Sequence, residues 1–111
     1  MTKKTNNIKN TLFTFQTIEE KTKYLHNCLK GEELVILSCG PSLRDLDMSL
    51  VESKFSNKYI ATVKQAYIPF QSQADFQFFN CNNFVDYDIG PNTISIVSSG
   101  VGVVNGRRGI W

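Results

Sequence analysis

The 111-residue sequence lacks the features that mark several large classes of protein. No apolar run approaches the ~18–20 residues needed to cross a bilayer, and the polar first ten residues lack the apolar core of a signal peptide. Three cysteines without a C-x-x-C pair and a single histidine, His26, do not form a zinc motif and indicate free thiols in a reducing compartment. A formal net charge of +2 is too small to indicate a nucleic-acid or membrane partner. We therefore expect a cytoplasmic protein with no transmembrane segment, no nucleic-acid partner and no bound metal.

Three motifs of common enzyme families are also absent. The sequence contains no G-x-x-x-x-G-K-[ST] phosphate loop, no G-x-G-x-x-G dinucleotide fingerprint and no G-x-S-x-G nucleophile elbow. Asp86 and Asp88 are the candidate metal ligands, but two carboxylates beside Gly90 and Pro91 are more typical of a turn. His26 falls on a predicted helix, where a solvated histidine is more common than a catalytic one.

What the sequence has is an alternation of strand-like and helix-like segments. Apolar, β-branched and aromatic runs predict strands at residues 34–38, 58–63, 75–79 and 93–97. The run at 34–38 is typical of a strand covered on both faces. The alternation predicts an α/β fold: a Rossmann-like, open, mostly parallel sheet of about four strands with flanking helices, and an incomplete version of a larger domain.

Two capping boxes predict where the helices begin. Thr17 with Glu20 predicts a helix that ends before Gly31, and Ser42 with Asp45 predicts a helix over residues 43–52. A short helical or irregular piece at residues 66–72 is expected to stop at Pro69. In the helix that begins after Thr17, the predicted buried face contains Ile18, Leu25 and Leu29.

The sequence also predicts the domain boundaries and an open edge of the sheet. Residues 1–15 carry no sustained periodicity and are predicted to be a flexible N-terminal segment, followed by one nucleotide-binding domain over residues 16–111. A parallel sheet this small leaves an open edge, so a second chain or a homo-oligomer is expected to cover it.

Small or amide-bearing residues follow every predicted strand. Since ligands of open α/β sheets bind outside the carboxyl ends of the strands, these residues are the predicted site. The turn from residue 38 into a helix N-terminus is a predicted anion site, amides suit a base or a ribose, and a lysine suits a phosphate. Turn formation alone also explains such residues. The candidate nucleotide-binding residues are Ser38, Cys39, Gly40, Pro41, Ser42, Lys64, Gln65, Asn80, Asn82, Ser99 and Gly100.

The same residues carry a family resemblance. The stretch Val-Ile-Leu-Ser-Cys-Gly-Pro-Ser-Leu-Arg-Asp-Leu-Asp at 35–47 resembles the first strand and G-P-S-L loop of the bacterial sialyltransferases of glycosyltransferase family 42. The loop also occurs in the motility-accessory-factor glycosyltransferases and in 6-hydroxymethylpterin diphosphokinase-like domains. Residues 61–65, 75–80 and 98–101 are similar to later strands and to a Ser-Gly segment of these families. The resemblance covers residues 33–101.

The resemblance implies a nucleotide pocket for a CMP-activated sugar such as CMP-sialic acid, bound as substrate and without a cofactor. It assigns to that pocket Cys39, Gly40, Pro41, Ser42, Gln65, Asn80, Ser99 and Gly100. Cys39 and Lys64 stand where the sialyltransferases have asparagines. The families continue beyond the point where this chain stops, to phosphate-binding tyrosines and a histidine base. No residue here matches that base, so the catalytic residues stay unassigned.

Three functions are therefore compatible with the sequence. The first is a glycosyltransferase-like protein, which positions a donor and needs a general base elsewhere. The second is a pterin diphosphokinase-like enzyme, for which Asp86 and Asp88 would have to hold Mg²⁺. The third is a non-catalytic or truncated nucleotide-binding module.

Overall fold

The fold is a single sheet with helices on both faces. The structure is a computed structural model, which describes residues 3–79, 89–97 and 109–110. The sheet has the order β1-β2-β3-β4-β5. Parallel pairing joins β1 (Leu34–Leu37), β2 (Tyr59–Val63), β3 (Phe76–Phe79) and β4 (Ile94–Val97), while β5 (Gly109–Ile110) pairs antiparallel with β4. The prediction of an α/β fold with a mostly parallel sheet is confirmed.

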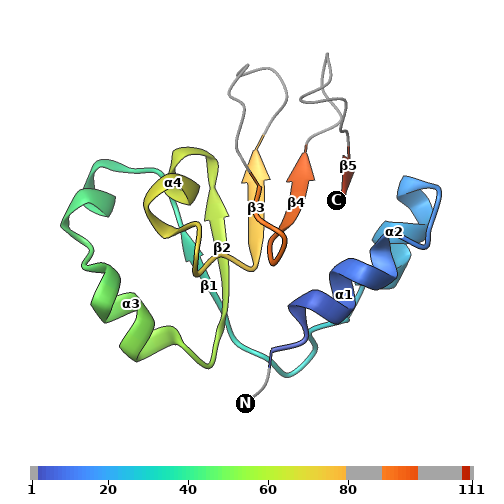
Figure 1. The fold of residues 1–111 in the computed structure, drawn as a ribbon, viewed down its shortest axis with the longest axis horizontal. Helices are drawn as coiled ribbons and strands as arrows, with labels where there is room; N and C mark the ends of the chain where they lie inside the picture. Colours follow the sequence, from blue (N-terminus) through green and yellow to red (C-terminus); the bar gives the residue numbers. More distant parts are fainter. Residues whose placement is uncertain (1–2, 80–88, 98–108, 111) are drawn as a thin grey trace.

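The helices divide between the two faces of the sheet. α1 (Thr5–Leu12) and α2 (Ile18–Leu25) lie on one face, whereas α3 (Met48–Phe55) and α4 (Tyr67–Phe70) lie on the other (Figure 1). Two short 3₁₀ helices, η1 (Pro41–Asp45) and η2 (Lys64–Ala66), lie in the connections from β1 to β2 and from β2 to β3. Pro69 therefore lies within α4 and does not stop a helix there, because a first-turn proline gives up no intrahelical hydrogen bond.

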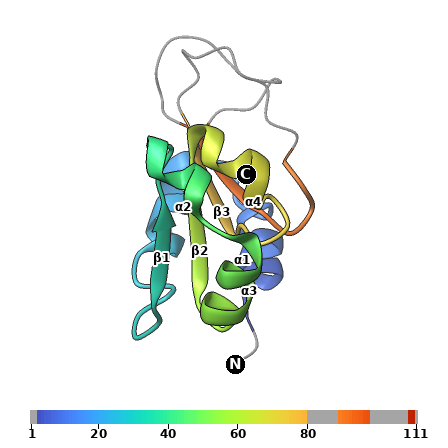
Figure 2. The same cartoon turned by 90° about the vertical axis from the view of Figure 1, so that its left-hand side faces the viewer.

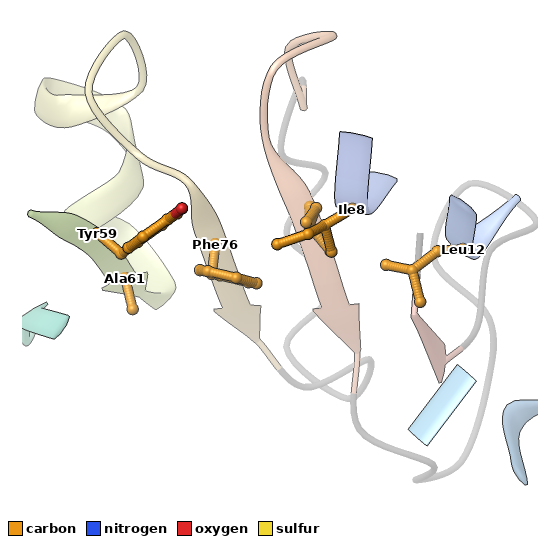
Figure 3. Close-up of a cluster of buried hydrophobic side chains, with 6 residues drawn as sticks. Ile8, Leu12, Tyr59, Ala61 and Phe76 are labelled. Atoms are coloured by element: carbon orange, nitrogen blue, oxygen red, sulfur yellow. The ribbon is translucent and has the colours of Figure 1, made fainter. Parts of the chain in front are cut away.

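Helix α1 stands where the sequence predicted a flexible segment, so that prediction is corrected for Thr5–Leu12. Ile8 and Leu12 are buried against strand residues of β2, β3 and β4 (Figure 3). The helix is also tied to the sheet by polar contacts: the backbone N–H of Lys4 donates to the Tyr59 hydroxyl at 2.9 Å, and Thr5 Oγ1 donates to the Asp75 carboxylate at 2.8 Å. With only two large apolar residues in eight positions, the sequence signal for this helix is weak.

Helix α2 begins as predicted and ends earlier than predicted. Thr17 is its N-cap and accepts a hydrogen bond from the backbone N–H of Glu20 at 3.1 Å. The helix ends at Leu25 because the chain turns through Asn27, whose φ of 61° is left-handed, well before Gly31. Ile18 is exposed, contrary to the prediction, while Leu25 and Leu29 pack against the core as expected.

The core has two layers, one on each side of the sheet. On the α1 face it contains Ile8, Leu12, Tyr59, Ala61, Phe76 and Ile94. On the α3 and α4 face it contains Leu37, Val51, Ile60, Ala66 and Phe70, with Tyr67, Ala74, Phe79 and Val97 beside them.

Strand β1 lies at the outer edge of the sheet and is not covered on both faces (Figure 2). Val35 and Leu37 face the α3 layer, but Leu34 and Ile36 are 48% and 62% exposed. The prediction of a strand buried on both faces is therefore wrong, because α1 packs on β2, β3 and β4 and does not reach β1.

Candidate functional site

The predicted site residues that the structure describes lie along one edge of the sheet. Because β1 to β4 are parallel, their carboxyl ends point to the same edge, at the top of the sheet in Figure 1. Leu37 pairs with Thr62, so the segments that follow β1 and β2 leave the sheet side by side. The structure thus brings together residues 38–42 with Lys64 and Gln65; Asn80, Asn82, Ser99 and Gly100 lie outside the described residues. We call residues 38–42 and 64–65 the carboxyl rim.

The loop after β1 presents a glycine that the fold itself does not require. Gly40 has φ −72° and ψ 167°, an extended conformation that any residue adopts. A Cβ atom built at Gly40 meets no atom within 4 Å. Ser38, Cys39, Pro41 and Ser42 are exposed beside it. The open space at Gly40 leaves its backbone accessible to a ligand.

The loop does not lead directly into an α-helix, which corrects the predicted capping box of Ser42 and Asp45. Pro41–Asp45 is a 3₁₀ helix whose N-cap, Gly40, makes no side-chain capping bond. The α-helix α3 begins only at Met48, capped by Asp47, whose carboxylate accepts hydrogen bonds from the Ser49 hydroxyl at 2.8 Å and the Ser49 backbone N–H at 2.9 Å. These two bonds lower the pKa of Asp47. The α-helix N-terminus that was expected at the loop lies instead at Asp47, five residues after Ser42, where the protein's own carboxylate occupies it.

The strand order also limits the depth of the site. The strands follow one another in sequence order, and the two described crossovers, through α3 and α4, lie on the same face. A deep crevice in such sheets forms where neighbouring connections leave on opposite faces. Between β1 and β3 the carboxyl rim is therefore an exposed ledge, not the crevice that converging strand ends were expected to form.

Lys64 is the residue of the rim with the most unusual backbone. Its φ of 52° is left-handed, a conformation that non-glycine residues rarely adopt. Gln77 of β3 donates from Nε2 to the carbonyl oxygen of Lys64 at 2.9 Å, and Thr62 Oγ1 donates to Gln77 Oε1 at 2.6 Å. Sequence reasoning missed Gln77, although a glutamine inside the aromatic run of residues 76–79 was a readable signal.

Sequence reasoning also missed a cavity on the opposite side of the sheet from α3. It has a volume of about 370 Å³ and lies between the chain that follows α2 and the strands, where it is lined mainly by apolar side chains. Leu34 and Phe78, both partly exposed, form part of its wall. Side chains of β1 alternate between the two faces of the sheet, and no described helix covers β1 on the face to which Leu34 points. The cavity lies on that uncovered face.

The described cysteines differ in environment, and we expect them to differ in reactivity. Cys28 is half-buried in the wall of the cavity, and desolvation raises the pKa of its thiol, whereas Cys39 is exposed on the rim. In a Cys81→Ser background, iodoacetamide should modify Cys39 severalfold faster than Cys28 near neutral pH, because the thiolate is the nucleophile. The rate at Cys28 should rise as the pH increases from about 7 to about 9. Peptide mass spectrometry measures both rates; equal rates in the folded protein, with the same pH dependence, would contradict the expectation.

The described residues show no metal centre and no membrane helix. Within residues 3–79 and 89–97, no three His, Cys, Asp or Glu side chains gather closely enough to hold an ion. Asp86 and Asp88 lie outside the described residues. His26 is exposed at the C-cap of α2 and does not belong to the carboxyl rim. Among the described helices, none combines the length and apolar character that a membrane span requires.

Comparison with known proteins found no matching protein family, no similar curated protein and no similar solved structure. The resemblance to glycosyltransferase family 42 therefore stays a prediction that rests on its motifs.

Proposed function

We propose that this chain is a glycosyltransferase-like protein that binds a nucleotide-activated sugar, of the CMP-sialic acid type, at the carboxyl rim. The observation that carries the proposal is the G-P-S-L loop, which follows β1 with its glycine backbone open to solvent. Gly40 is required neither by a positive φ nor by close packing. A remaining reason for a glycine in a loop is that a ligand approaches the backbone closely, and this is the role we propose for Gly40. Lys64 on the neighbouring segment supplies a cation suited to the donor's phosphate.

The second candidate is a nucleotide-binding module without transferase activity. Transfer to a hydroxyl acceptor needs a general base within hydrogen-bond reach of it. The single histidine of the sequence caps α2, which lies on the face opposite α3. The residues that support donor binding therefore do not by themselves support catalysis, and binding is the part of the proposal to test first.

A thermal-shift titration with CMP, UMP and CMP-sialic acid tests the binding proposal. A ligand at ten times its Kd should stabilise the folded state by about 1.4 kcal/mol, a melting shift of about 5 °C for a domain of this size. Gly40→Val should abolish the shift, since its side chain would fill the space through which the ligand reaches the backbone. The same variant should melt within about 2 °C of the wild-type protein, because its Cβ meets no atom within 4 Å.

The matched control is Gly90→Ala, in the connection that precedes β4 and away from the rim; its Cβ would make only an ordinary contact, 3.8 Å from the Tyr67 hydroxyl. This variant should retain the full shift. Absence of any shift with all three ligands at millimolar concentration would reject nucleotide binding. A full shift in Gly40→Val would reject the role of the loop.

A further inference from the structure

A buried polar chain links the interior of the sheet to the carboxyl rim. Thr62 and Gln77 are register partners on β2 and β3, and each is 0% exposed. The Thr62 hydroxyl donates to Gln77 Oε1 at 2.6 Å, and Gln77 Nε2 donates to the carbonyl oxygen of Lys64 at 2.9 Å. Both ends of the amide are thus used, and the hydroxyl orients the amide so that its donor faces Lys64.

The carbonyl that Gln77 holds belongs to the residue with the least favourable backbone on the rim. Lys64 adopts a φ of 52° directly after β2 ends at Val63. A lysine persists in the left-handed region only where surrounding contacts hold it, and such residues concentrate at ligand sites. The bond from Gln77 is the contact to the Lys64 backbone from the neighbouring strand.

The Lys64 side chain is available for a ligand. It is half-buried, and within the described ranges no carboxylate lies at ion-pair distance from its ammonium; the ion pairs found there join Lys3 to Asp75 and Lys58 to Glu33. A half-buried lysine without a carboxylate partner among the described residues suits an anion, and phosphate is the anion that a nucleotide ligand brings.

We infer that Gln77 is a positioning residue that holds Lys64 in its left-handed conformation, so that the lysine ammonium anchors the phosphate of the nucleotide. The inference rests on the proposed function and deepens it: the rim recognises the phosphate as well as the nucleoside. Gln77 itself is fully buried and acts only through Lys64.

The test separates binding of the phosphate from binding of the nucleoside. Isothermal titration calorimetry of the full chain with cytidine and with CMP gives the ratio of their Kd values, which a merely structural change leaves constant. In the wild-type protein CMP should bind at least about tenfold more tightly than cytidine, as one charge-assisted bond predicts. Lys64→Ala should remove most of this ratio, and Lys64→Arg, which keeps the charge, should retain more of it than Lys64→Ala.

Gln77→Met, of similar volume and without polar atoms, should lower the ratio by about fivefold while the Kd for cytidine changes less than twofold. In the Lys64→Ala background the same change should have no further effect, because the residue that it positions is gone. Thr62→Val, which removes only the orienting hydroxyl, should lower the ratio by about twofold and serves if Gln77→Met does not fold.

The outcomes are distinguishable. If the wild-type protein binds neither cytidine nor CMP, the proposed function fails and the inference fails with it. If both bind and the ratio falls in Lys64→Ala but not in Gln77→Met or Thr62→Val, the proposed function stands and the positioning role is rejected. If the ratio is unchanged in Lys64→Ala, Lys64 is not the phosphate anchor.

Discussion

Replacing Asp75 with alanine should lower the free energy of unfolding by about 4 kcal/mol, since it leaves two buried donors unpaired at about 1–3 kcal/mol each. Asp75 is only 6% exposed. Its carboxylate accepts hydrogen bonds from Thr5 Oγ1 at 2.8 Å, from the Ile60 backbone N–H at 2.9 Å and from Lys3 Nζ at 2.9 Å. In the alanine variant Lys3 can turn to water, but Thr5 and Ile60 remain buried without this acceptor.

Urea unfolding followed by circular dichroism measures the effect, and the neighbours of Asp75 supply its controls. Thr5→Val should cost about 1–2 kcal/mol, because it removes one of the three bonds. Lys3→Met should cost less than about 1 kcal/mol, since that pair is partly exposed to solvent. With a total stability of about 5–15 kcal/mol expected for such a domain, Asp75→Ala removes a large share. A loss in Asp75→Ala no greater than that in Lys3→Met would show that the carboxylate does not hold α1 to the sheet.

The sheet could be predicted from the sequence because its signals are local. Strand runs rich in β-branched and aromatic residues, separated by small and polar residues, placed all four parallel strands within one or two residues of where they lie. Thr17 correctly marked the start of α2, because an N-cap acts on a backbone N–H three residues away.

The features that could not be predicted depend on distant partners. Helix α1 has a weak local pattern and is stabilised by the core and by two hydrogen bonds, to Tyr59 and Asp75, each from a residue more than 50 positions away along the chain. The exposed face of β1 depends on strand order, which periodicity does not reveal. At the candidate site, Ser42 and Asp45 had the spacing of a capping box, but Asp47 and Ser49 form the cap that begins α3. Gln77 has the sequence pattern of an ordinary strand residue, because its role depends on a hydrogen bond to Lys64, 13 residues away along the chain.

The second large effect is expected within α1 itself: Leu12→Ala should lower the free energy of unfolding by about 3 kcal/mol. Leu12 is 0% exposed and belongs to the core layer with Tyr59, Phe76 and Ile94. The substitution removes buried methyl groups and leaves a cavity, and both terms oppose folding. The loss tests whether α1 packs as part of the domain. If residues 1–15 were a flexible segment that does not pack on the core, the substitution would leave the free energy of unfolding unchanged.

The matched control is the next residue along the chain. Phe13 is 53% exposed, and its ring lies 6.0 Å from the Lys9 ammonium. Phe13→Ala should therefore cost less than about 1 kcal/mol, although it deletes the larger side chain. Urea unfolding of the two variants compares a buried and an exposed position within one turn. Small and similar losses of stability in both variants would show that residues 1–15 are the flexible segment that the sequence predicts. A loss confined to Leu12→Ala would establish α1 as part of the core, which the apolar pattern of the segment was too sparse to indicate.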